Sequence, residues 1–188
     1  FEVNEGEVVT LIGANGAGKS TFARCLCGLD KRALGELELN GHSYRAKQRC
    51  HISYMVMQDV NHQLFTEDVL DELLLSMDGE DEKENTEWAN QILSSLDLAA
   101  KIKLHPMSLS GGEKQRVAIG SAIASNKEIL VFDEPTSGLD YFHMVEVSDN
   151  LNRLKDMGKS LFLITHDPEL IYKCCTYLLF IQENKVLW

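Results

Sequence analysis

The segment Gly13–Thr21 carries the clearest chemical pattern in this sequence. It fits the spacing GxxxxGK(S/T) and lies between an apolar stretch and a predicted helix. Glycines let the backbone curl so that its N–H groups point inward, and a helix N-terminus adds a dipole that favours an anion. We therefore predict a polyphosphate-binding loop, with Lys19 near the β- and γ-phosphates and the Ser20 hydroxyl on Mg²⁺. The expected phosphate-binding residues are Gly13, Asn15, Gly16, Ala17, Gly18, Lys19, Ser20 and Thr21.

Two adjacent acids follow the apolar run Ile129–Phe132. A buried parallel strand delivers its last residues to the carboxyl edge of the sheet, where the phosphates also lie. Successive strand residues point to opposite faces, so the two acids can divide the chemistry. We predict that Asp133 ligates Mg²⁺ and that Glu134 orients the attacking water or accepts its proton. The alternative is an acidic helix cap after a core strand.

His166 follows a second apolar run, Leu161–Thr165. This run is one strand beyond the two acids, so we expect His166 at the same sheet edge and in contact with the γ-phosphate. The other histidines show no metal-ligand spacing and are interpreted as structural or surface residues: His42, His51, His62, His105 and His143.

The elements that must position these residues alternate between strands and helices. Apolar stretches at 7–12, 51–57, 129–132 and 161–165 are predicted strands, and the segments 19–27, 69–77, 88–96, 112–125 and 141–157 are predicted helices. Leu37–Leu39 followed by Asn40-Gly41 predicts a hairpin, as does 177–187. The acidic stretch 78–85 is expected to be a surface loop. The pattern indicates an α/β protein with a mainly parallel sheet and a small antiparallel β portion.

The segment Leu109–Arg116 reads Leu-Ser-Gly-Gly-Glu-Lys-Gln-Arg and precedes a predicted helix. Ser110, Gly111 and Gly112 with that helix N-terminus would form a second anion cradle. The segment resembles the LSGGQ signature of ABC ATPases. The resemblance implies why one domain would carry two anion cradles. In that family two domains form a head-to-tail pair, and the signature of one domain closes over the ATP bound to the other.

Other motifs extend the resemblance over essentially the whole chain. Gln58 resembles the glutamine of the Q-loop, the segment 137–140 resembles the D-loop, and His166 resembles the switch histidine. The resemblance implies a P-loop NTPase of the ABC type over 1–188, with a helical subdomain at approximately 60–125. It also implies an ATPase that uses ATP and Mg²⁺. The implied catalytic residues are Glu134, His166 and Gln58, and the implied metal ligands are Ser20, Gln58 and Asp133.

The segment Met57–Glu72 resembles the Q-loop region of ATPases from energy-coupling-factor (ECF) transporters, which import vitamins and transition-metal ions in prokaryotes. This implies a second ABC ATPase domain, identical, different or in tandem, and a transmembrane subunit at the cytoplasmic face of the membrane. Leu64 and Phe65 are then either docking residues or ordinary core residues. The alternatives are another importer or exporter, or a non-transport ABC ATPase acting on DNA or ribosomes.

Composition limits these alternatives. The net charge is −11 without a cluster of basic residues, which disfavours a nucleic-acid partner. The apolar runs are shorter than the roughly 20 residues of a membrane-spanning helix, and the first residues do not resemble a signal peptide. The interval from Thr21 to Leu109 shows no sustained heptads, unlike coiled-coil DNA-repair ATPases. The five cysteines are expected to be reduced core residues.

The N-terminal part of the pattern departs from the family. Only twelve residues precede Gly13, whereas the family has an adenine-stacking aromatic residue well upstream, on a loop that follows an opening strand. We expect the sequence to lack that strand and loop. Phe1 is not expected to be the adenine platform.

Overall fold

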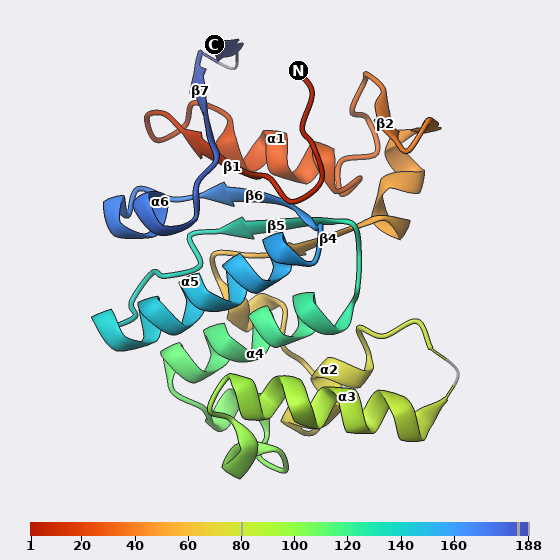
Figure 1. The fold of residues 1–188 in the computed structure, drawn as a ribbon, viewed down its shortest axis with the longest axis vertical. Coiled ribbons are helices and arrows are strands. Elements are labelled where there is room, and N and C mark those ends of the chain that lie inside the picture. The colour runs from red at the N-terminus through yellow and green to blue at the C-terminus, as the bar shows by residue number, and fades with distance from the viewer. Residues whose placement is uncertain (80, 184, 188) are drawn as a thin grey trace.

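A computed structural model describes residues 1–79, 81–183 and 185–187. Its centre is a six-stranded sheet in the order β4-β5-β6-β1-β7-β8 (Figure 1). The strands are β1 (Val8–Ile12), β4 (Ser53–Val56), β5 (Ile129–Asp133), β6 (Ser160–Ile164), β7 (Tyr177–Gln182) and β8 (Lys185–Leu187). All neighbouring strands are parallel except β7 and β8, which form an antiparallel pair. The predicted α/β class with a mainly parallel sheet is confirmed.

Helices cover both faces of the sheet, which is why its central strands are nearly continuous apolar runs. Helix α1 (Lys19–Leu26) packs on the face that includes Leu11 and Val131. Helices α4 (Gly111–Ala124), α5 (Tyr141–Asp156) and α6 (Pro168–Cys174) contribute to a second core on the face that includes Leu130 and Leu163. Alternate residues of β5 therefore enter opposite cores.

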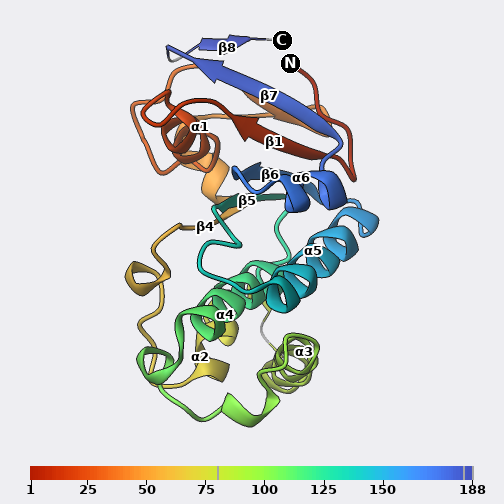
Figure 2. The ribbon, with the colours of Figure 1, turned by 90° about the vertical axis from the view of Figure 1, so that its left-hand side faces the viewer.

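A helical part lies at the end of the molecule away from the chain termini (Figure 2). It contains α2 (Val69–Leu74), α3 (Glu82–Ser95) and α4, with short 3₁₀ helices at Val60–His62, Ala99–Lys101 and Pro106–Ser108. A further 3₁₀ helix, Ala46–His51, precedes β4. The apolar residues of these helices belong to the same core as one face of the sheet. The assignment of 60–125 as a separate subdomain stays a prediction.

A small hairpin forms where the sequence predicts it. Strands β2 (Leu37–Leu39) and β3 (His42–Tyr44) pair antiparallel. The turn residues Asn40 and Gly41 both have positive φ, 51° and 74°, as a two-residue hairpin turn requires. The predicted closing hairpin is also present as β7 and β8.

Two predictions of local structure were wrong. The acidic stretch 78–85 is not wholly a loop, because α3 begins at Glu82 within it. The carboxylate of Asp81 accepts hydrogen bonds from the backbone N–H groups of Lys83 and Glu84, and acids in a first turn complement the helix dipole. Glu80 lies outside the described residues. Cys50 is exposed and not a core residue, although all five cysteines are free thiols in the described structure.

The structure separates the two apolar residues of the Q-loop region. Leu64 is 3% exposed and belongs to the main core, whereas Phe65 is 73% exposed. Leu64→Ala is therefore expected to lower the free energy of unfolding by about 2–5 kcal/mol, because it leaves a cavity. Phe65→Ala is the matched control and should change it by less than ~0.5 kcal/mol. Urea denaturation measures both, and equal stability of the two variants would contradict this placement.

Candidate active site

The loop after β1 has the geometry of an anion cradle. Gly13 has φ of 151°, and a Cβ at this position would lie 2.1 Å from the carbonyl oxygen of Ile181, so a glycine is required. Lys19, the first residue of α1, donates from Nζ to the carbonyl oxygens of Gly13 at 2.8 Å and Ala14 at 3.0 Å. No side chain of the described residues caps α1. The N-terminus of α1 therefore lies beside the glycine loop with its cation in place.

Glu134 and His166 are brought together by the pairing of β5 with β6. The Nδ1 atom of His166 lies 2.9 Å from Oε1 of Glu134. Glu134 has a left-handed backbone with φ of 51°, and its N–H donates to the carbonyl of Ile164 at 2.8 Å. Residues held in such sparsely populated backbone conformations cluster at functional sites. The hydrogen bond to Glu134 and the negative charge of Glu134 raise the pKa of His166.

Asp133 ends β5 inside the protein, with 6% of its surface exposed. Burial raises the pKa of Asp133, and the charge of Glu134 raises it further. A hydrogen bond with the Ser20 side chain and the charge of Lys19 oppose this rise. A desolvated carboxylate beside a hydroxyl is an oxygen-rich donor set of the kind that Mg²⁺ prefers, so these residues fit the predicted metal.

One cleft of about 780 Å³ brings most of the predicted residues together. Gln58, just beyond β4, also lines this cleft. In the sheet, β5 and β6 lie between β4 and β1, the strand that precedes the glycine loop. The predicted residues on its lining are Gly13, Asn15, Gly16, Gly18, Lys19, Ser20, Thr21, Gln58, Asp133, Glu134 and His166. Ala17 is buried and packs in the core beside α1. The shared location agrees with the predicted roles, which stay predictions.

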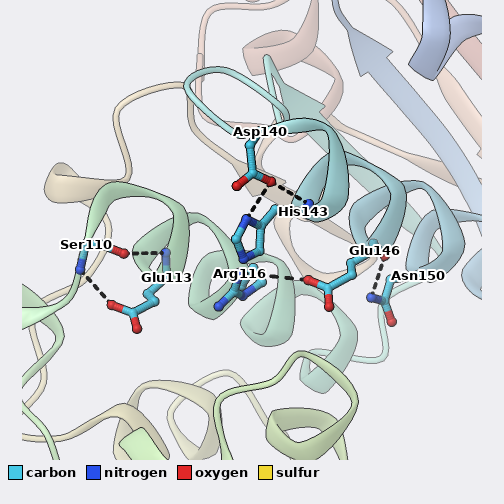
Figure 3. A network of polar contacts seen from close by, with 7 residues as sticks. All are labelled: Ser110, Glu113, Arg116, Asp140, His143, Glu146 and Asn150. Atoms are coloured by element: carbon cyan, nitrogen blue, oxygen red, sulfur yellow. Dashed lines mark hydrogen bonds and ion pairs between the residues drawn. The ribbon is translucent and has the colours of Figure 1, made fainter.

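Ser110, Gly111 and Gly112 lie elsewhere and are not among the residues that line this cleft in the described structure. Ser110 caps α4, and its N–H donates to Oε2 of Glu113 at 2.8 Å (Figure 3). The hydrogen bond from the Ser110 N–H lowers the pKa of Glu113, and Lys101, 3.3 Å away, lowers it further. The second cradle is thus separate from the first and open at the surface.

Sequence reasoning missed the residues that hold His166 in place. The hydroxyl of Thr136 donates to Oδ2 of Asp167 at 3.1 Å, which ties the loop after β5 to the loop after β6. Asp167 also caps α6, a helix that the sequence analysis did not predict. The signal was present, because an Asp followed by a Pro is typical of a helix start.

Comparison with known proteins decides the family. The family model described as ABC transporter matches residues 1–137. The chain belongs to the ABC transporter family. A putative ABC transporter ATP-binding protein from Treponema denticola is 43% identical over 188 residues, which is 100% of this chain and 37% of that relative. This ABC domain thus spans well under half the length of that curated relative.

Solved ABC structures share the fold. The structure of cbiO1 from Clostridium perfringens, part of the ABC transporter complex cbiONQ, has a TM-score of 0.85 at 24% identity and covers 100% of this chain and 78% of its own. A dimeric ATP-binding cassette in a post-hydrolysis state with ADP and Pi has a TM-score of 0.86 at 26% identity, with 100% and 86% covered. The predicted ABC ATPase fold is confirmed.

The Glu134–His166 contact predicts a change in titration. In the nucleotide-free ABC domain, Glu134→Gln should lower the pKa of His166, because it weakens the hydrogen bond and removes the charge that together raise this pKa. The contact contributes fully to the stability of the folded state at pH below the ordinary pKa of histidine. This contribution is lost as the pH rises through the raised pKa of His166 in the folded state. NMR titration of the His166 ring measures the change. Glu113→Gln is the control and should leave the His166 pKa unchanged; an equal effect of both variants would contradict the assignment.

Proposed function

We propose that this ABC domain binds ATP with Mg²⁺ and hydrolyses it to power a transporter. The observation that carries the proposal is the Glu134–His166 pair at 2.9 Å in the cleft that Lys19 also lines. A general base must lie within hydrogen-bond reach of the groups with which it acts, and this pair places a carboxylate and its partner beside an anion cradle. Degenerate domains that lack either residue would not have this arrangement.

The residues of the cleft divide the chemistry. The N–H groups of the phosphate loop and the Lys19 ammonium bind the phosphates, and Ser20, Gln58 and Asp133 would hold Mg²⁺. When bound, Mg²⁺ supplies positive charge that neutralises the phosphate oxygens. The Glu134 carboxylate orients the attacking water and accepts its proton. His166 fixes that carboxylate and contacts the γ-phosphate.

Pairing with a second ABC ATPase domain is the second part of the proposal. The exposed Ser110 cradle lies outside the cleft that contains Lys19, so it has no phosphate to serve within its own domain. The similar cassette solved as a dimer supports a paired arrangement. We propose that Ser110, Gly111 and Gly112 bind the ATP of the partner domain, which is identical, different or in tandem.

Contacts of the Q-loop region support coupling to a transmembrane subunit. Asn61 accepts a hydrogen bond from Lys114 of α4 at 2.9 Å, which links this region to the signature helix. The buried carboxylate of Glu72 then accepts from the N–H groups of Phe65 and Thr66, both at 3.0 Å, and from the Thr66 hydroxyl at 2.6 Å. These bonds hold Phe65 in its exposed position, where we propose that it docks on the transmembrane subunit.

Import of a vitamin or metal ion by an ECF-type transporter is the finer proposal. It is supported by the resemblance of the segment Met57–Glu72 to the Q-loop region of ECF ATPases. No helix among the described residues is long and apolar enough to span a membrane. The proposed docking on a transmembrane subunit implies a peripheral location at the cytoplasmic face of a prokaryotic membrane.

Glu134→Gln tests the proposed hydrolysis. In the full-length protein this variant should keep ATP affinity and lose about 10²–10⁴-fold in hydrolysis rate, because the amide does not accept the proton from water. Nucleotide binding and phosphate release are the two measurements. Glu169→Gln, which changes an exposed acid of α6 near His166, is the matched control and should keep normal turnover. Near-normal turnover of Glu134→Gln would remove Glu134 from its role.

Phe65→Ala tests the docking surface. It should reduce transport and co-purification with the transmembrane subunit while ATP affinity stays unchanged, because the ring is exposed and is not among the residues that line the cleft. The matched control is Tyr172→Ala, which removes a ring that is 92% exposed on α6. Normal transport and normal co-purification of Phe65→Ala would exclude Phe65 from the docking surface.

A further inference from the structure

Two surface loops that are distant in the sequence meet at the N-terminal ends of α4 and α5. Gly112 lies in the first turn of α4, and a Cβ added there would lie 3.1 Å from Cδ2 of Leu139. The absence of a side chain at Gly112 thus lets the loop before α5 approach closely. Asp140 caps α5 by accepting from the N–H of His143 at 3.0 Å, and its Oδ1 lies 2.8 Å from the Nδ1 atom of the same histidine.

An ion pair between a buried arginine and a partly exposed glutamate joins the same two helices. The Arg116 side chain on α4 is 5% exposed, and its Nη1 atom lies 3.8 Å from Oε2 of Glu146 on α5. Neither Nε of Arg116 nor Oε2 of Glu146 has a hydrogen-bond partner among the described residues. Glu146 therefore supplies a counter-charge to the buried Arg116 side chain across the two helices. Figure 3 shows the Arg116 side chain joined to Glu146, on the same side of the molecule as the cap residues Ser110 and Asp140.

The joined loops form one exposed surface outside the cleft that contains Lys19. Ser110 is exposed on the α4 side, and Ser137 and Gly138 are exposed on the α5 side. Tyr141 and Phe142, 64% and 66% exposed, add aromatic rings beside them. Two loops already fixed to each other engage a partner at a lower entropic cost than two independent loops.

We propose that Arg116, Glu146 and Leu139 are positioning residues that hold the Ser110 cradle and the loop 137–140 in one orientation. The two loops then engage the ATP site of the partner domain as a single unit. This inference rests on the proposed function, because it requires Ser110 to serve a nucleotide held by a second ABC ATPase domain. Loss of the Arg116–Glu146 ion pair or of the Leu139–Gly112 contact lets α4 and α5 shift against each other. ATP binding at the partner's site then weakens, whereas ATP binding in the chain's own cleft does not change.

The test uses the full assembly, with this chain carrying Lys19→Ala and the partner domain intact. Hydrolysis then remains at the partner's site, which this chain's Ser110 completes. Glu146→Gln in the Lys19→Ala chain should raise the KM for ATP about tenfold or more, because it leaves Arg116 buried without its counter-charge. In a chain with Lys19 intact, the same substitution should leave ATP affinity at the chain's own phosphate loop unchanged. A general loss of stability does not produce this difference between the two sites.

A second variant keeps the ion pair. Leu139→Ala removes the contact with Gly112 and should also raise the KM at the partner's site. The double variant Leu139→Ala/Glu146→Gln should show less than the combined effect, because both substitutions loosen one unit. Glu128→Gln is the matched control, since it removes the charge that pairs with the buried Lys159 at 3.2 Å, outside α4 and α5. It should leave the KM unchanged, and thermal melting verifies that each variant is folded.

Ser110→Arg in the Lys19→Ala chain separates the two ways to fail. If hydrolysis at the partner's site survives Ser110→Arg, the proposed pairing is wrong and this inference with it. If Ser110→Arg abolishes that hydrolysis but Glu146→Gln and Leu139→Ala leave the KM unchanged, the positioning role is overturned. Equal losses at both ATP sites from Glu146→Gln would also overturn it.

Discussion

The parallel pairing of β6 between β1 and β5 is the constraint on which the candidate site depends. In this register Ile164 lies beside both Leu11 and Asp133. The loops after all three strands therefore leave the sheet at the same edge. The glycine loop after β1, the paired acids and His166 meet there because of strand register, although long segments of sequence separate them. A slip of one residue in β6 would turn its side chains to the opposite face and remove His166 from Glu134.

Desolvation gives this edge its chemical character. Burial penalises the ionised carboxylate of Asp133 and raises its pKa, and a bound cation would offset that penalty. Lys19 bonds to carbonyl oxygens of the loop that precedes it, which places its charge in the same cleft. The molecule carries a net charge of −11 but gathers both signs at the site. A polyphosphate would be attracted to the positive charge at this site, and its divalent cation to the negative charges.

The helical part is not independent of the sheet. Leu73 and Val117 from α2 and α4 share one continuous core with Phe132 and Leu163 from β5 and β6. Close-packed side chains transmit displacement, so a shift of the Q-loop region would be felt by the signature helix through the Lys114–Asn61 hydrogen bond and through this core. Coupling between the ATP cleft and the exposed Phe65 needs such a packed connection. It also needs two conformations of the domain that bind ATP with different affinities.

The sequence by itself determined the α/β class, the glycine loop between β1 and α1, the acids after β5 and the hairpin at Asn40-Gly41. Each of these depends on local rules: apolar runs, glycine where φ is positive, and the spacing of residues along one turn or one strand. Helix starts were less well predicted. Asp81 and Asp167 cap α3 and α6, but an acidic or polar stretch alone does not distinguish a cap residue from a loop residue.

Only the tertiary structure decided how separate segments combine. It placed Leu64 in the core and left Phe65 exposed, a difference that neighbouring apolar residues do not reveal because it depends on which side chain meets α2 and α4. It also set the Glu134–His166 contact, the Thr136–Asp167 bond and the Arg116–Glu146 ion pair. These contacts join residues from different elements, and the distance between two such residues is fixed by strand register and helix packing, which local sequence patterns do not encode.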